Sequence, residues 1–100
     1  MIAFDQTWSS VATTGGQATV PLNGCDADSW RAYVEASSGT ATTGAIQVSL
    51  STVGPWVSVV STSVSSATMG AMDFSGPLFG VVRAYSGSTG ATIRLVGVAG

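Results

Sequence analysis

Hydrophobic residues alternate with polar residues along much of this chain, which is the pattern of a β-strand that buries one face. A helix would instead repeat its apolar positions every three to four residues. The alternating apolar positions are Trp30, Ala32, Val34 and Ala36, then Ile46, Val48 and Leu50, and in a shorter run Ala18, Val20 and Leu22. Each run predicts a strand with these side chains in the core.

Three further segments are apolar at both odd and even positions. They are residues 56–64, 78–85 and 92–98. A strand that is covered on both faces has no need of polar residues on either side, so it reads as a continuous apolar run. We therefore expect these segments to be central strands, or strands that are covered on both faces.

Turn residues divide the chain between these segments. They are Gly15-Gly16, Asn23-Gly24, Ser38-Gly39, Gly44, Gly54-Pro55, Gly76-Pro77 and the stretch 86–90. The two Gly-Pro pairs are each expected to open an apolar strand, where proline's missing N–H falls outside the ladder. A helix over 26–36 with Asp26 as its N-cap is an alternative, although the alternation from Trp30 onward favours a strand.

The predicted strands are eight in number and short. They cover 7–12, 17–22, 29–37, 45–52, 56–64, 68–74, 78–85 and 91–98. Short strands at regular spacing with turns between them are typical of sandwiches and jelly rolls. We predict an all-β fold, with residues 1–100 forming a single antiparallel β-sandwich or jelly-roll-like domain.

The chain carries few charges, and neither lysine nor histidine is present. Only 8% of its residues are charged, against about 25% in ordinary soluble domains. The charged residues are Asp5, Asp26, Asp28, Glu35 and Asp73 against Arg31, Arg83 and Arg94, a net charge of −2. Without a basic patch, neither nucleic acid nor an anionic membrane surface is an expected partner.

The sequence shows no segment that would direct the chain to a membrane. No apolar run approaches the roughly 20 residues of a membrane span. The first residues, Met-Ile-Ala-Phe-Asp, have neither the basic start nor the apolar stretch of a signal peptide. We expect the chain to be made and folded in a cytosol.

The residue types needed for catalysis and metal binding are missing. Serine and the single Cys25 have no histidine or lysine to activate them, so nucleophilic catalysis is not expected. One cysteine can form neither a zinc site nor an internal disulfide. Asn23, Asp26 and Asp28 could offer oxygen atoms to Ca²⁺, but solvated turn aspartates are the simpler interpretation. We expect no enzyme activity, no cofactor and no metal.

Six residues are candidates for contacts with a partner. Large aromatic residues fill a core, contact another subunit or form a platform for sugar, and all three roles are open for Trp8, Trp30 and Trp56. The arginines Arg31, Arg83 and Arg94 are candidates for ion pairs with Asp5, Glu35 or Asp73, within one subunit or between subunits.

The C-terminal half resembles a known group of proteins. Its residues are Gly-Pro-Leu-Phe-Gly-Val-Val-Arg-Ala-Tyr at 76–85, then Ser-Gly-Ser-Thr-Gly, then Ala-Thr-Ile-Arg-Leu-Val-Gly at 91–97. This succession is similar to the end of small virion proteins of tailed bacteriophages, and the preceding strand at 56–64 fits the same pattern. The resemblance covers residues 54–100, whereas residues 1–50 show no such motif.

The resemblance implies a β-sandwich protein of the phage particle. Such proteins include capsid decoration (cement) proteins, head fibres and tail-associated proteins. They are non-enzymatic, often trimeric, and bind the major capsid protein or other virion proteins. The location implied is the virion, after synthesis in the host bacterial cytoplasm. The absence of lysine, which usually protects strand edges, is compatible with edges that are buried in an assembly. The alternative is a carbohydrate-binding or adhesion module with exposed tryptophans.

Overall fold

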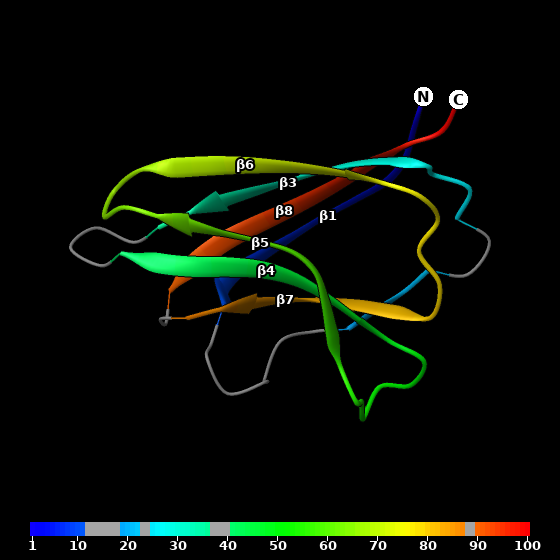
Figure 1. The fold of residues 1–100 in the computed structure, drawn as a ribbon, viewed down its shortest axis with the longest axis horizontal. Coiled ribbons are helices and arrows are strands. Elements are labelled where there is room, and N and C mark those ends of the chain that lie inside the picture. Colours follow the sequence, from blue (N-terminus) through cyan, green and yellow to red (C-terminus); the bar gives the residue numbers. More distant parts are fainter. Residues whose placement is uncertain (12–18, 23–24, 37–40, 88–89) are drawn as a thin grey trace.

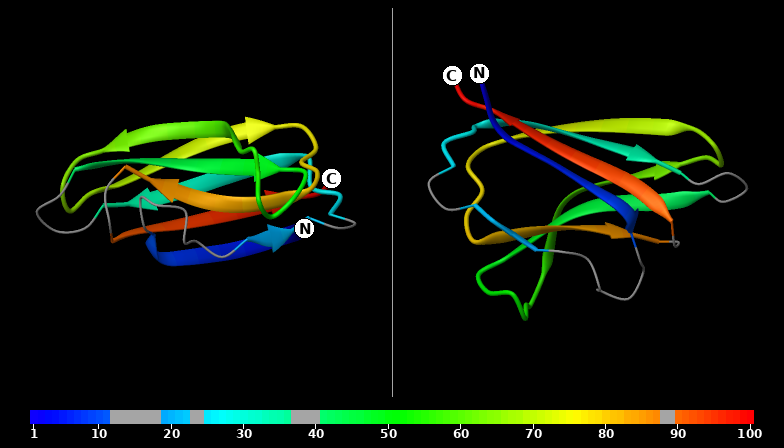
Figure 2. Two further views of the ribbon diagram at one scale, coloured as in Figure 1. Left: turned by 90° about the horizontal axis from the view of Figure 1, so that it is seen from below. Right: turned by 180° about the vertical axis from the view of Figure 1, so that it is seen from behind.

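Two antiparallel four-stranded sheets face each other in the structure (Figures 1 and 2). It is a computed structural model that describes residues 1–11, 19–22, 25–36, 41–87 and 90–100. The strands are β1 (Ile2–Val11), β2 (Val20–Pro21), β3 (Ser29–Glu35), β4 (Thr42–Ser49), β5 (Val57–Val64), β6 (Met69–Ser75), β7 (Val81–Ser86) and β8 (Ala91–Val98). The prediction of an all-β sandwich is confirmed.

Sheet A consists of β1, β8, β3 and β6, in that order. Its central strand β3 pairs with both neighbours over all seven of its residues and without a register shift. Along β3, Trp30, Ala32 and Val34 point into the core while Arg31 and Tyr33 point outward, as the alternation predicts. The edge strand β1 is less regular, with two register shifts against β8.

Sheet B has the order β2, β7, β4, β5. The strand β2 is only two residues long, so one edge of the sheet is short. At the other edge β5 pairs with β4 over Thr42–Val48, with a bulge where Ile46 faces Val60 and Gln47 faces Ser58. The bulge adds one residue to β5 and therefore reverses which positions face the core.

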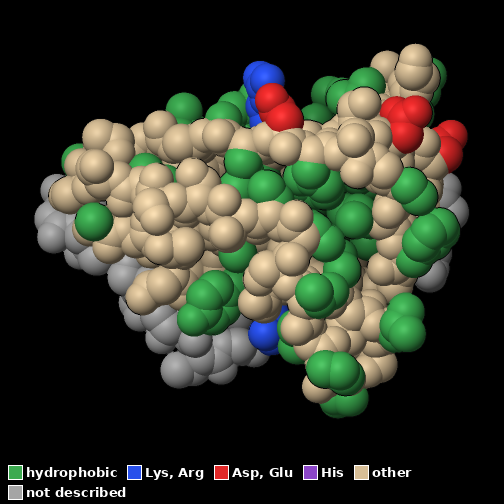
Figure 3. All heavy atoms as spheres, in the orientation of Figure 1, with side chains coloured by type: hydrophobic (Ala, Val, Ile, Leu, Met, Phe, Trp, Pro, Cys, Tyr) green, Lys and Arg blue, Asp and Glu red, His purple; other side chains and the backbone are tan. Residues whose placement is uncertain are grey.

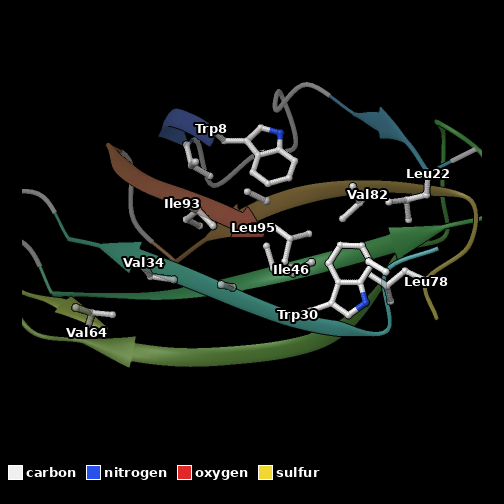
Figure 4. Close-up of a cluster of buried hydrophobic side chains, with 14 of the residues drawn as sticks. Trp8, Leu22, Trp30, Val34, Ile46, Val64, Leu78, Val82, Ile93 and Leu95 are labelled. Atoms are coloured by element: carbon white, nitrogen blue, oxygen red, sulfur yellow. The ribbon is translucent and has the colours of Figure 1, made fainter. Parts of the chain in front are cut away.

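The core lies between the two sheets (Figure 4). Its members are Trp8, Val11, Leu22, Ala27, Trp30, Ala32, Val34, Ala36, Ile46, Val64, Leu78, Val82, Ala84, Ile93 and Leu95. Burying a large aliphatic or aromatic side chain stabilises a fold by about 1.5–3 kcal/mol. The indole of Trp30 stacks on Phe74 with 6.0 Å between ring centroids and donates its N–H to the carbonyl of Gly76 at 2.9 Å.

One glycine of sheet A makes room for this indole. A Cβ at Gly97 would lie 2.6 Å from the Trp30 ring and 2.8 Å from the Cβ of Ala27. Gly97 and Trp30 are paired across β8 and β3, so the indole lies over a position without a side chain. The sheet can accept so large a residue at Trp30 because its neighbour is glycine.

The strand predictions are confirmed in order and number, with some errors at the ends. The helix alternative over 26–36 is wrong, because β3 occupies that segment. Both Gly-Pro pairs precede strands, but β5 begins at Val57 and β7 only at Val81. Residues 12, 17–18 and 37 of the predicted strands, and the turns at 15–16, 23–24, 38–39 and 88–89, lie outside the described residues.

Segments that are apolar at both odd and even positions are expected to be central strands, and this is correct for two of the three. Both β7 and β8 are central strands, whereas β5 is an edge strand. The bulge in β5 explains the error: Val57 pairs with Val48 before the bulge and Val60 pairs with Ile46 after it. Valines at odd and even positions therefore point to the same face, which a strict period of two does not anticipate.

Candidate protein-contact surface

The outer face of sheet A carries most of the charged residues, and four of them are joined in pairs. Arg31 donates Nε to Oδ1 of Asp73 at 2.6 Å and Nη2 to Oδ2 at 2.9 Å. Arg94 donates to Asp5 in the same way, at 2.8 and 2.6 Å. Each pair joins neighbouring strands, β3 to β6 and β8 to β1. Two-pronged arginine–carboxylate contacts of this kind hold both groups in a fixed geometry.

These pairs change the acidity of their members. Hydrogen bonds from Arg31 lower the pKa of Asp73, and those from Arg94 lower the pKa of Asp5. The same contacts raise the pKa of both arginines. Both pairs are solvent-exposed, so they contribute little to stability. Their main effect is that four charges are already neutralised within the chain.

Glu35 is the remaining charged residue of this face. Among the described residues it belongs to no ion pair. It lies at the end of β3 directly opposite Met69, which is 63% exposed. A hollow of about 410 Å³ beside it is lined by Thr7, Tyr33, Glu35, Met69, Thr92 and Arg94. A larger hollow of about 640 Å³ includes Arg31 and Asp73, whose charges cancel.

The outer face of sheet B has one charged residue, Arg83. Its Nε donates to Oε1 of Gln47 at 2.8 Å, and its guanidinium carbon lies 4.1 Å from the ring centroid of Trp56. The amide of Gln47 in turn donates to Ser58 Oγ at 3.3 Å, which fixes its oxygen toward Arg83. No carboxylate pairs with Arg83 in the described part of the chain. Partial burial lowers its pKa, because desolvation disfavours the cation.

An apolar groove lies next to Arg83 at one end of sheet B. It holds about 360 Å³ and is lined mainly by Val48, Leu50, Pro55, Trp56, Val57 and Phe79. Leu50 is 93% exposed and Phe79 is 73% exposed. Figure 3 shows hydrophobic side chains gathered on this side of the molecule, over the segments that lead into β5 and β7. Exposed apolar side chains grouped in this way mark protein contact sites.

The six candidate residues from the sequence separate into three groups. Trp8 and Trp30 lie in the core and are 5% and 3% exposed, so neither offers a surface for a ligand or a partner. Arg31 and Arg94 are held by carboxylates of their own chain. Arg83 of β7 and Trp56, the residue just before β5, meet in one cation–π contact beside the groove.

The sequence pattern did not identify Leu50, Phe79 or Gln47 as surface contacts. Leu50 continues the alternation of Ile46 and Val48, which predicts a core position, but β4 ends at Ser49 and the chain turns there. Phe79 falls in a predicted strand, whereas Gly80 has a φ of +86° and β7 starts one residue later. The turn signal at Gly54-Pro55 could have indicated that the strand before it ends early.

The described residues hold no other arrangement with obvious chemistry. They contain no group of three or more His, Cys, Asp or Glu residues that could bind a metal ion. Cys25 is half-buried and packs against the edge of the core. None of the described segments is a helix long and apolar enough to cross a bilayer.

Known structures resemble this chain in fold, but its sequence matches no known family. No protein-family model matches the chain, and no curated protein matches it. Among solved structures, the PBSX exported protein XepA is similar with a TM-score of 0.63 and 13% identity over 100% of this chain. This chain spans only 37% of XepA.

Two further structures share the fold. PirA is similar with a TM-score of 0.57 and 12% identity over 95% of this chain and 94% of its own. A chain of the Bacillus endospore appendages, which form disulfide-linked pili, is similar with a TM-score of 0.50 and 14% identity over 97% of this chain and 85% of its own. At such low identity these similarities establish the fold alone.

Proposed function

We propose that this chain is a non-enzymatic structural protein of a phage particle, a capsid decoration protein that binds and reinforces the head shell. The observation that carries the proposal is the apolar groove with its exposed Leu50 and Phe79, on a sheet whose outer face has one charged residue, Arg83. A small monomer gains nothing from such a surface, whereas an assembly buries it. The resemblance of residues 54–100 to virion proteins of tailed phages supports the same role.

The charged residues support a contact role over catalysis. Arg31, Arg94 and their aspartates are occupied with one another on an exposed face. An acid–base catalyst needs a group whose pKa is moved toward neutrality in a cleft, and Asp5 and Asp73 have theirs moved the other way. We propose that the chain acts through its surface and not through a reaction.

The similar folds favour an assembled protein outside the cytoplasm. One of them is described as exported, and another belongs to pili. A head fibre, a tail component or a self-assembling appendage would use the same apolar groove. We propose association with copies of itself, in a trimer by preference, together with binding to the major capsid protein or another virion protein.

The test uses virions from which the chain has been removed and to which it is added back. Particles with the chain should withstand a higher temperature than particles without it, because each bound copy stabilises the folded shell. Rebinding should change little between low and high salt, since a chain with a net charge of −2 has little long-range attraction to gain.

Three results would contradict the proposal in different ways. Equal heat resistance of the two particle types would exclude a cement role and favour a fibre or tail role. Release of the chain by moderate salt would show that the contact is mainly electrostatic. Absence of the chain from purified virions, together with binding to glycans on an array, would favour the carbohydrate-binding alternative, with Trp56 as the half-exposed tryptophan.

A further inference from the structure

The three arginines differ in what faces them across their sheets. Arg31 faces Asp73, and Arg94 is bound by Asp5. Arg83 faces Gln47, a neutral amide that accepts one hydrogen bond at Nε. Its guanidinium is thus held in position by Gln47 and the ring of Trp56 while its charge is not neutralised by any described residue. An arginine fixed by neutral groups is well prepared to bind a carboxylate that comes from outside.

The same chain carries a carboxylate with the complementary surroundings. Glu35 is exposed and has no cationic partner among the described residues. Exposed Met69 and the ring of Tyr33 lie beside it at a hollow of about 410 Å³. Arg83 is likewise next to apolar groups, those of the groove at Trp56. Each surface thus combines one unpaired charge with exposed apolar side chains, and the charges are of opposite sign.

The fold prevents these two groups from meeting within one molecule. Glu35 points outward from sheet A, and Arg83 points outward from sheet B, so the whole sandwich separates them. Two copies related by a twofold axis through either surface would bring like charges together, which is unfavourable. Only a head-to-tail arrangement joins unlike surfaces, and such an interface produces a closed ring or an open filament.

We propose that copies of this chain associate head to tail, with Arg83 on sheet B of one copy binding Glu35 on sheet A of the next. The apolar groove around Trp56 packs near Met69 and Tyr33 of that next copy and excludes water from the ion pair. This inference rests on the proposed role in an assembly and specifies the contact between subunits. Because the two surfaces lie on opposite faces of the sandwich, repeated contacts stack the copies in an open filament unless the rotation between neighbouring copies closes the stack into a ring.

Two other carboxylates are the competitors of Glu35. Asp26 and Asp28 are exposed and belong to no ion pair among the described residues. They lie in the segment just before β3, and neither lines a described hollow that includes an exposed methionine or leucine. Glu35 is favoured because it combines charge with an apolar neighbour, and the aspartates serve as controls.

The experiment measures self-association of the purified chain by sedimentation over a concentration series. Arg83→Gln and Glu35→Gln should each weaken association by roughly 10- to 100-fold, the usual consequence of truncating one partner of a desolvated charge pair. The reversed pair, Arg83→Glu together with Glu35→Arg, should recover most of the loss. Recovery in the double variant cannot come from a general defect in folding, so it separates a direct contact from structural damage.

A second variant tests the availability of Arg83 without removing it. Gln47→Glu places a carboxylate of the same chain opposite Arg83, as Asp73 is placed opposite Arg31. It should weaken association as strongly as Arg83→Gln, while the temperature of unfolding stays the same or rises. Asp26→Asn and Arg31→Gln change the net charge by the same amount elsewhere and should alter association by less than about twofold.

Each remaining outcome overturns the inference. If the wild-type chain associates but the Arg83 and Glu35 variants associate equally well, the subunit contact lies elsewhere and the proposed structural role is untouched. If Arg83→Gln weakens association and Glu35→Gln does not, or if Asp26→Asn does, the partner carboxylate is wrong. If the wild-type chain stays monomeric at high micromolar concentration, head-to-tail association fails, and the virion experiment still decides the proposed function.

Discussion

The two sheets treat an arginine on a central strand in opposite ways. In sheet A, Arg31 faces an aspartate and the two charges cancel. In sheet B, Arg83 occupies the equivalent outward position on a central strand and faces Gln47. Gln47 carries an amide where Asp73 carries a carboxylate. Arg31 is therefore paired within the chain, whereas Arg83 remains available to a partner. A charge is informative about partners only when its own sheet does not already satisfy it.

The exposed apolar residues are grouped differently on the two sheets. Sheet A has regular ladders through β3, and its large aromatic residue Trp30 lies inside. Sheet B ends in a groove with Leu50 and Phe79 exposed. The core-facing side of sheet A therefore serves as the scaffold, and sheet B offers apolar contact area beside an unpaired cation. Variants of each sheet can test this division.

Adding a side chain inside the scaffold should damage the fold far more than adding one on sheet B. In Gly97→Val the new side chain would collide with the ring of Trp30 and with Ala27. The free energy of unfolding in urea should fall by about 3 kcal/mol, the upper range for overpacked cores. The matched variant Ser61→Val, on the exposed side of β5, should change it by less than about 0.5 kcal/mol. Equal effects would contradict the division.

Polar substitution in the groove should affect association but not stability. Leu50→Ser and Phe79→Ser remove side chains that are mostly exposed, so the free energy of unfolding should change by less than about 0.5 kcal/mol. Each should weaken self-association or rebinding to particles by about tenfold, because less apolar area is buried. Ile2→Ser, at the edge of sheet A, is the control and should bind normally. Normal binding of both groove variants would show that the groove is not used.

The sequence predicted the strands well because burial of one face dictates the alternation of β3 and β4. The same alternation places Trp30 on one face with Ala32 and Val34, but the sequence left a core position, a subunit contact and a sugar platform all open for it. The sequence could not locate the bulge in β5, because the extra residue does not alter the composition. It only switches the core-facing positions between odd and even residue numbers. The sequence also extended β4 to Leu50, since an apolar residue in register looks buried until the turn is known.

The candidate site could be predicted only in part. All three arginines have the same chemistry in the sequence, and nothing there tells which of them faces a carboxylate. That depends on register: Arg31 is opposite Asp73 because β3 and β6 pair with no shift, and Arg83 is opposite Gln47 through the pairing of β7 and β4. Pairing between distant strands is a property of the fold and not of any local pattern.

The cation–π contact should couple Trp56 and Arg83 energetically. A double-mutant cycle with Trp56→Leu and Arg83→Gln should give a coupling of about 0.5–1 kcal/mol in the free energy of unfolding. Trp56→Phe keeps an aromatic face and should retain part of it. A coupling near zero would mean that the ring does not help to position the guanidinium, and the availability of Arg83 would then depend on Gln47 alone.

The smallest expected effect is a loss of stability at low pH. The pKa values of Asp5 and Asp73 lie below the ordinary 3.8 because their arginines stabilise the charged form. The stability that they add is complete above pH 3.8 and is lost as the pH falls through the lowered pKa values. Carboxyl titration by NMR should show this, and Arg31→Gln should return Asp73 toward 3.8 without changing Asp5. Arg83→Gln should leave both pKa values unchanged.

The pairing of β1 with β8 has a consequence for how this fold can be combined with other proteins. The amide of Ala99 donates to the carbonyl of Met1 at 3.0 Å, and Figure 1 shows the two ends leaving from one corner of the sandwich. A unit with neighbouring ends can be inserted into a surface loop of a host protein without forcing that loop apart. The inserted domain would then project from the surface of the host protein, with the outer faces of sheet A and sheet B both free for contacts.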